Sequence, residues 1–287
     1  MISIANRIRD KREVRSTEDF EHIKAANLCF LLCICIEMGS IILMPLMGMQ
    51  VSRIAIYGLT FLMAVYMSYH YKTYIPVKKL NPDMFIKCIG LAVCGIPIAM
   101  LLNGLADMLA NYGAEQTQDI NRYPIGVALF AFAIVPAFVE EYVFRGFILE
   151  TYDKVEAIPA IFFSSLFFAL LHFSLGSVLY GFFYGCLFAM VVLATDNILY
   201  SMVMHLIFNS INVGMCYVDI GQIPAIAIVS IMIVGTIGFC VLAIVFFRKY
   251  QIIVLNIKHY KPWDYLTKEG YVAVGICSMV ILMLLMM

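Results

Sequence analysis

The sequence predicts an all-α protein that crosses a membrane as a polytopic bundle of eight to nine transmembrane helices. Of the 287 residues, 63% are hydrophobic and 13% are charged, about half the charged share of a typical soluble domain. The apolar residues form long runs, and a helix needs about 20 residues to cross a bilayer. The sequence lacks the apolar–polar alternation of a membrane β-barrel. Because backbone groups in lipid must bond within their own segment, these runs indicate helices.

Nine apolar runs follow one another along the chain, and we expect each to form a helix. They cover residues 26–48, 54–71, 84–109, 125–149, 157–173, 177–195, 198–217, 223–247 and 271–287. The late polar segment 248–270 mixes apolar and basic residues with the sole tryptophan, which is typical of an interfacial segment. The nine cysteines include no CxxC pair, so we expect them to be packing residues rather than disulfide partners or a thiolate metal site.

The distribution of lysine and arginine predicts the orientation. Six of these residues lie in 1–24, four in 72–87 and five in 248–268. With nine crossings, these three segments lie on one side of the membrane, and the opposite loops hold only Arg53 and Arg122. Basic loops stay in the cytoplasm. We therefore expect an integral membrane protein with a cytoplasmic N-terminus, and the first residues show no cleavable signal peptide.

Polar residues within the apolar runs divide the chain into three parts. Residues 1–123 contain an N-terminal cytoplasmic segment and three transmembrane helices. Residues 124–217 form a core that holds the buried polar residues, and residues 218–287 contain the C-terminal transmembrane helices and a cytoplasmic loop. The net charge is zero, so we expect the lipid bilayer rather than a nucleic acid as a partner. The sequence leaves the oligomeric state open.

The fourth run contains Glu140, Glu141 and Arg145 in the sequence AFVEEYVFRGF. Ionisable groups at membrane depth are costly and rare, so each is a candidate functional residue. Glu141 and Arg145 are four residues apart and share a helix face, which allows them to pair. Glu140 lies about 100° around the same helix from Glu141. It is therefore free to face another group.

Two further helices each contribute a histidine. Phe168 and His172 are four residues apart at the end of the fifth run, and His205 and Asn209 have the same spacing in the seventh. A carboxylate, two imidazoles and a carboxamide could bind and deprotonate water, by a general base alone or with a metal. Read singly, the Glu–Arg pair, either histidine or Asn209 could instead be structural.

Depth within the helices gives a partial check on this grouping. At about 1.5 Å per residue, Glu140 lies roughly 15 Å and His205 roughly 10 Å from the predicted cytoplasmic ends of their helices. His172 lies roughly 20 Å from its own cytoplasmic end, so it matches the other two less well. Glu37, inside the first run, has no partner in its own helix and is a weaker candidate for a catalytic or coupling role.

Three sequence motifs carry a resemblance to a known family. EEYVFRG (140–146), FALLH (168–172) and HLIFN (205–209) match EExxxR, FxxxH and HxxxN. In this order they resemble the CPBP family of intramembrane proteases, which includes the type II CAAX prenyl endopeptidases, the Abi-type bacteriocin-immunity proteins and the lysostaphin-resistance proteins. The resemblance covers about residues 124–217. It implies a bundle of about eight transmembrane helices with a site reached from the cytoplasm.

The resemblance also implies a role for each motif residue. Glu140 would activate water together with His172, and His205 and Asn209 would stabilise the oxyanion or complete the water site. Glu141 and Arg145 would be a supporting pair or would help to hold the substrate. The predicted activity is therefore endopeptidase cleavage of membrane-associated peptides or proteins at the cytoplasmic side. A bacterial signalling peptide or bacteriocin precursor is the substrate we favour over a prenylated protein, and a bacterial plasma membrane is the expected location.

The sequence leaves alternatives open for the cofactor and for the type of function. Glu140, His172, His205 and Asn209 could together bind zinc, but asparagine is an uncommon zinc ligand and two histidines with a carboxylate are the minimum catalytic set. We therefore favour a glutamate-dependent mechanism without a cofactor. The competing functions are a non-proteolytic membrane scaffold or bacteriocin-immunity protein, and a small transporter. The absence of paired half-helices disfavours the transporter.

Overall fold

The computed structural model describes residues 16–110, 120–218, 224–249 and 260–286. Within these ranges the chain forms helices and no strand. Eight helical segments are long and apolar enough to cross a membrane, and a ninth apolar helix, α9 (Ala157–Leu170), is shorter. The predicted fold class, a polytopic transmembrane helical bundle, is therefore confirmed.

The N-terminal part contains α2 (Thr17–Met47), α3 (Met49–His70), α4 (Pro82–Cys94) and α5 (Ile96–Ala110). The Ser16 hydroxyl accepts a hydrogen bond from the Asp19 backbone N–H at 3.0 Å. This cap starts α2 at Thr17, well before the apolar run at residue 26. The single predicted run 84–109 forms two helices, because Pro97 has no N–H to offer the carbonyl of Val93.

The central span is one continuous helical segment with changing turn width. It consists of α6 (Ile125–Leu129), η2 (Phe130–Ile134), α7 (Val135–Glu141), η3 (Tyr142–Leu149) and α8 (Glu150–Asp153). Both η2 and η3 have the wider π-helical turn. Pro136 cannot donate a backbone hydrogen bond to Phe132, which accounts for the register change in η2. The wider turns flank Glu140 and Glu141, and such turns are frequent at functional sites.

The C-terminal half contains α10 (Leu175–Thr195), α11 (Ile198–Met215), α12 (Ala225–Lys249) and α13 (Lys268–Met286). Helix α9 ends at Leu170, ahead of the predicted end at residue 173, and Phe173 has a left-handed φ of 50°. Between α10 and α11, Asp196 is also left-handed, with φ 49°. The Asn197 side chain caps α11 by accepting the Leu199 N–H at 3.1 Å.

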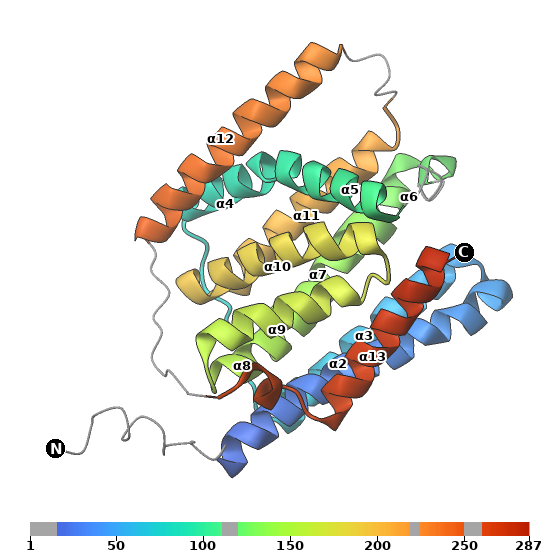
Figure 1. Cartoon of the computed structure of the whole chain (residues 1–287), viewed down its shortest axis with the longest axis vertical. Coiled ribbons are helices and arrows are strands. Elements are labelled where there is room, and N and C mark those ends of the chain that lie inside the picture. The colour runs from blue at the N-terminus through green and yellow to red at the C-terminus, as the bar shows by residue number, and fades with distance from the viewer. Residues whose placement is uncertain (1–15, 111–119, 219–223, 250–259, 287) are drawn as a thin grey trace.

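The spans form a bundle in which successive helices run in opposite directions (Figure 1). Helix α12 lies along one edge beside α4 and α5, and α2, α3 and α13 form the opposite edge (Figure 1). The central helices α7, α9, α10 and α11 lie between these two edges. The buried polar residues of the predicted site therefore lie within the middle of the bundle.

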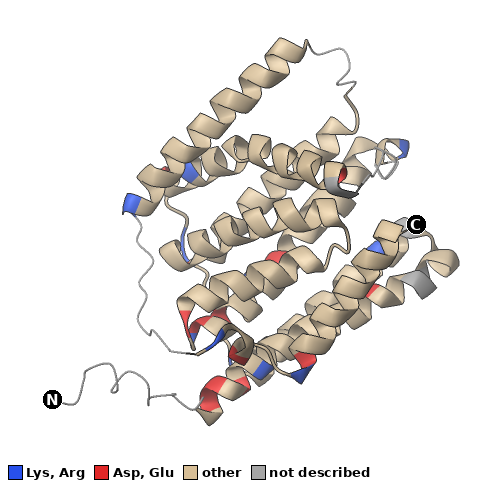
Figure 2. Cartoon of the chain, viewed as in Figure 1, with Lys and Arg blue, Asp and Glu red and all other residues tan. Residues whose placement is uncertain are grey.

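The two ends of the bundle differ in charge. We call the end with the connection 71–81, the turn 154–156, the turn 196–197 and the last turn of α12 the basic end. The opposite end, with Gly48, Arg122 and the α9–α10 turn, is the distal end. Most charged residues of the described chain lie toward the basic end (Figure 2).

Ion pairs tie the connections of the basic end together. Lys78 pairs with Asp196 across the connection 71–81 and the α10–α11 turn, and the hydrogen bond between them raises the pKa of the Lys78 ammonium. Asp83 accepts from Lys87 at 2.6 Å and from Lys249 at 2.9 Å. The Asp83 contacts join the start of α4 to the end of α12. The Lys78–Asp196 pair holds the connection 71–81 against the turn before α11.

Candidate active site

The predicted site begins with a fully buried ion pair on the central span. The Arg145 guanidinium donates through one terminal nitrogen to Glu141 Oε1 at 3.0 Å and through the other to the Gly185 carbonyl at 3.1 Å. Its central carbon lies 4.4 Å from the centroid of the Phe168 ring. Both charged side chains are 0% exposed. The i, i+4 pair expected from the sequence is present and joins α7 to α10.

Glu141 has a second partner that spacing along its own helix does not reveal. His205 Nδ1 lies 2.9 Å from the same Oε1 atom that accepts from Arg145. A carboxylate paired with arginine accepts hydrogen bonds, so the His205 proton lies on Nδ1 in the neutral ring and Nε2 carries a lone pair. Glu141 thereby fixes the orientation of His205, as outer carboxylates do for functional histidines.

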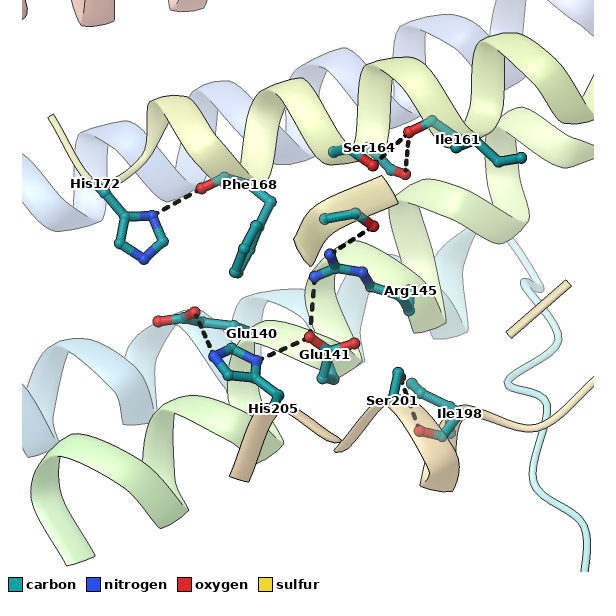
Figure 3. Close-up of polar contacts among 12 residues, drawn as sticks. Glu140, Glu141, Arg145, Ile161, Ser164, Phe168, His172, Ile198, Ser201 and His205 are labelled. Carbon is teal, nitrogen blue, oxygen red and sulfur yellow. Dashed lines mark hydrogen bonds and ion pairs between the residues drawn. The ribbon is translucent and has the colours of Figure 1, made fainter. Parts of the chain in front are cut away.

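Glu140 lies on the other side of the same imidazole. Its Oε2 is 3.8 Å from His205 Nε2, too far for a hydrogen bond. Within the described residues, this buried oxygen has no hydrogen-bond partner. Its Oε1 accepts a hydrogen bond from the Tyr57 hydroxyl at 2.8 Å. Glu140 is therefore anchored through one oxygen and presents the other beside Nε2 (Figure 3).

Tyr57 is a site residue that the three motifs do not include, because it lies on α3. Its side chain is nearly buried, and it is four residues from Arg53 on a mostly apolar helix. That i, i+4 pair of polar side chains is the signal that could have indicated a polar face on α3.

His172 occupies the exposed edge of the site. Its Nδ1 lies 2.9 Å from the Phe168 carbonyl, and its ring meets the Phe168 ring edge-on at 5.1 Å. In Figure 3 the His172 imidazole and the Glu140 carboxyl group point toward the same space beside Phe168. No hydrogen bond or ion pair joins these two side chains among the residues that the structure describes.

Phe168 is the packing centre of the site. Besides His172 and Arg145, its ring contacts the His205 ring, with centroids 5.6 Å apart and planes nearly perpendicular. Asn209 lies one turn beyond His205 on α11 and is half-buried, and within the described ranges it makes no hydrogen bond. The structure thus brings Glu140, Glu141, Arg145 and His205 into one network, with His172 and Asn209 beside it on the distal side.

The donor atoms do not fit a zinc site with three protein ligands. Among the residues of the described ranges, no group of three or more His, Cys, Asp and Glu side chains is arranged to hold a metal ion. Tyr57 engages one Glu140 oxygen and Glu141 engages His205 Nδ1. Glu140 Oε2 and His205 Nε2 face each other at 3.8 Å, but within the described residues no hydrogen bond or ion pair joins His172 to either atom, and catalytic zinc takes three protein ligands.

The fold and this cluster define a polytopic membrane protein with a buried carboxylate–imidazole site. Residues 123–211 match the family described as type II CAAX prenyl endopeptidase Rce1-like. The segment holds all three motifs, so the match confirms the predicted resemblance to the CPBP family of intramembrane proteases. No curated protein and no solved structure matches the chain.

Proposed function

We propose that this protein is an intramembrane endopeptidase in which Glu140 and His205 hold and activate a water molecule without a metal. One observation carries the proposal: a buried carboxylate oxygen without a hydrogen-bond partner in the described chain lies 3.8 Å from an imidazole nitrogen with a free lone pair. Two acceptors at this separation can each bind one hydrogen of a single water that lies off the line between them. The water oxygen then keeps a lone pair for attack.

The chemical steps follow from this geometry. Glu140 removes one proton as the water oxygen attacks the peptide carbonyl carbon, and the carbonyl oxygen becomes the oxyanion of a tetrahedral intermediate. Asn209, on the His205 face of α11, offers an N–H donor for the oxyanion. The C–N bond then breaks, and Glu140 returns its proton to the leaving amine. His205 holds the remaining hydrogen of the attacking water throughout.

His172 takes the role nearest to the substrate. The family resemblance pairs it with Glu140, and its Nδ1 contact with the Phe168 carbonyl leaves Nε2 free. Because the ring is at the exposed edge, it contacts the peptide once substrate is bound and helps Glu140 to transfer the proton. The glutamates therefore differ in role: Glu140 acts on water, and Glu141 with Arg145 positions His205.

The test compares a catalytic variant with a matched control on the same span. In Glu140→Gln the carboxamide keeps the size of the side chain but cannot serve as a base, and we expect cleavage to be lost. Glu150→Gln changes a half-buried carboxyl group at the basic end and should retain cleavage. Because the substrate is unidentified, membrane and released peptides are compared by mass spectrometry in cells that express each variant at equal abundance.

The outcome separates the peptidase from the scaffold or immunity alternative. Peptides that depend on the wild-type protein and disappear in Glu140→Gln and His172→Ala support the proposal. Identical peptide patterns in the wild type and Glu140→Gln, or a Glu140→Gln protein with full biological effect, would contradict it and favour the scaffold. The substrate class favoured from the sequence, a bacterial peptide precursor, predicts that the accumulating species are short membrane-associated peptides.

A further inference from the structure

Helix α10 carries two hydroxyl side chains in a mostly apolar stretch. The Tyr180 hydroxyl donates to Ser177 Oγ at 3.1 Å, and both side chains are half-buried. Within the described residues, neither hydroxyl bonds to another helix. Tyr184, one turn further along, is 1% exposed, and its hydroxyl donates to the Ala92 carbonyl on α4 at 2.8 Å. The Tyr184 hydroxyl therefore joins two helices, whereas the Tyr180–Ser177 pair does not.

Ring contacts place this pair on the side of α10 that faces α11. The centroid of the Phe188 ring lies 5.5 Å from that of the His205 ring. About two turns earlier on α10, the Tyr180 ring lies 5.8 Å from the ring of Phe208, the residue before Asn209. Because α10 and α11 are antiparallel (Figure 1), following α10 back toward its start leads from His205 toward Asn209. The pair therefore lies beside the Asn209 end of the site.

Close packing against α9 places the pair near His172 as well. A Cβ added to Gly181 would lie 3.5 Å from Ala169 Cα, so the backbones of α10 and α9 approach closely at this level. The two helices are antiparallel (Figure 1), so one turn earlier on α10 corresponds to one turn later on α9. This register brings Ser177 to the level of the turn that holds His172.

The surroundings of the pair suit the binding of a peptide backbone. His172 lies on the α9 side and Asn209 on the α11 side, and Tyr180 is within electrostatic range of Glu140. A peptide that enters the bundle leaves water, so its backbone N–H and C=O groups need new partners. A hydroxyl can donate and accept. Tyr180 can turn its O–H from Ser177 to a peptide carbonyl, and the serine oxygen can then accept from a peptide N–H.

We propose that the Tyr180–Ser177 pair binds the backbone of the substrate peptide and holds it in register with Glu140. The inference rests on the proposed peptidase function. Tyr180 lies eight residues before Phe188, which contacts His205, and eight residues of helix span about 12 Å. An extended peptide advances about 3.3 Å per residue, so the pair meets the substrate about three to four residues from the cleaved bond.

The test measures cleavage kinetics of the purified full-length protein in detergent micelles. The substrate is a synthetic copy of a peptide whose cleavage in cells depends on Glu140. Tyr180→Phe keeps the ring and removes a contact that is equal in the ground and transition states. We therefore expect KM to rise about two- to tenfold with kcat nearly unchanged. Tyr184→Phe is the matched control, because it also removes one hydroxyl from α10, and its KM should stay at the wild-type value.

Further variants separate binding from folding. Ser177→Ala should raise KM, and Ser177→Thr, which keeps a hydroxyl, should restore it. The midpoint of detergent unfolding should be unchanged in Tyr180→Phe, whose lost hydroxyl bonds only within its own helix, and lowered in Tyr184→Phe. Two shortened peptides, each with about two residues left on one side of the cleaved bond, locate the contact. With one of them, the wild type and Tyr180→Phe should have equal KM values.

The inference and the peptidase function fail in distinguishable ways. A wild-type KM in Tyr180→Phe, or an equal rise of KM in Tyr184→Phe, would overturn the role of the pair and leave the peptidase intact. An undiminished Tyr180→Phe effect on both shortened peptides would also overturn it, because the pair would not bind at the expected distance. If no peptide in cells depends on Glu140, the peptidase function is wrong, and the role of the pair falls with it.

Discussion

Replacing Arg145 by methionine should destabilise the protein more than replacing Arg145 and Glu141 together. Arg145→Met leaves the Glu141 carboxylate, which is 0% exposed, without its cation. Loss of one partner from a buried pair costs about 3–5 kcal/mol. The variant also loses the hydrogen bond to the Gly185 carbonyl and the contact over Phe168. These terms are worth about 1 kcal/mol and about 0.5–2 kcal/mol.

The double variant Glu141→Gln/Arg145→Met removes both charges and keeps an oxygen that can accept the His205 Nδ1–H. It still loses the Gly185 and Phe168 contacts, so the net cost should be about 1–3 kcal/mol. Neutral replacement of a buried pair is otherwise close to neutral or stabilising. The double variant should therefore be more stable than Arg145→Met alone, although it carries one more substitution.

The assay is loss of helical circular dichroism of purified protein in mixed micelles as the fraction of denaturing detergent rises. The matched control is Lys78→Met, which breaks the exposed pair with Asp196 and should leave the midpoint unchanged, because surface pairs contribute little. A double variant no more stable than Arg145→Met would refute the reasoning. It would mean that Glu141 does not depend on Arg145 for its buried charge.

Three further variants or measurements follow from individual contacts. Tyr57→Phe removes the hydroxyl that donates to Glu140 Oε1; we expect kcat to fall about tenfold with little change in KM, and an unchanged kcat would remove Tyr57 from the site. Gly270→Ala places a Cβ against Asn27 Oδ1 and should cost about 1–3 kcal/mol by detergent unfolding, whereas Gly275→Ala, with nothing within 4 Å, should not. Purified active protein should contain no stoichiometric zinc by elemental analysis and should resist chelators; the opposite result would refute the metal-free mechanism.

The helices could be predicted because lipid allows few alternatives to a helical backbone. The errors in the predicted helix bounds occur where a single side chain sets the end of a helix. Helix α2 starts early because Ser16 caps a polar first turn that hydropathy does not count. The run 84–109 is divided at Pro97, and α9 ends early at the left-handed Phe173. These positions depend on single residues rather than on average composition.

The site could be predicted within helices but not between them. Spacing along one helix placed Glu141 beside Arg145, since side chains four residues apart share a face. It could not place His205 against Glu141 or Tyr57 against Glu140, because the rotation and height of one helix against another depend on packing along its whole length. The depth argument for His172 had the same weakness: it compared positions along separate helices.

In the proposed mechanism, the imidazole of His205 explains how two adjacent glutamates can serve one reaction. Consecutive residues on a helix diverge by about 100°, so Glu140 and Glu141 cannot face one partner from the same direction. They approach the ring from its two ends: Glu141 contacts Nδ1 at 2.9 Å, and Glu140 lies 3.8 Å from Nε2. The carboxylate held by Arg145 sets the proton position, and the Oε2 atom of the other faces Nε2 without a hydrogen bond within the described chain. If Glu140 instead occupied the environment of Glu141, the proposed base would pair with arginine, and this pairing would lower the basicity of the carboxylate. In the proposed mechanism, the order Glu–Glu with arginine four residues after the second glutamate therefore assigns the two roles.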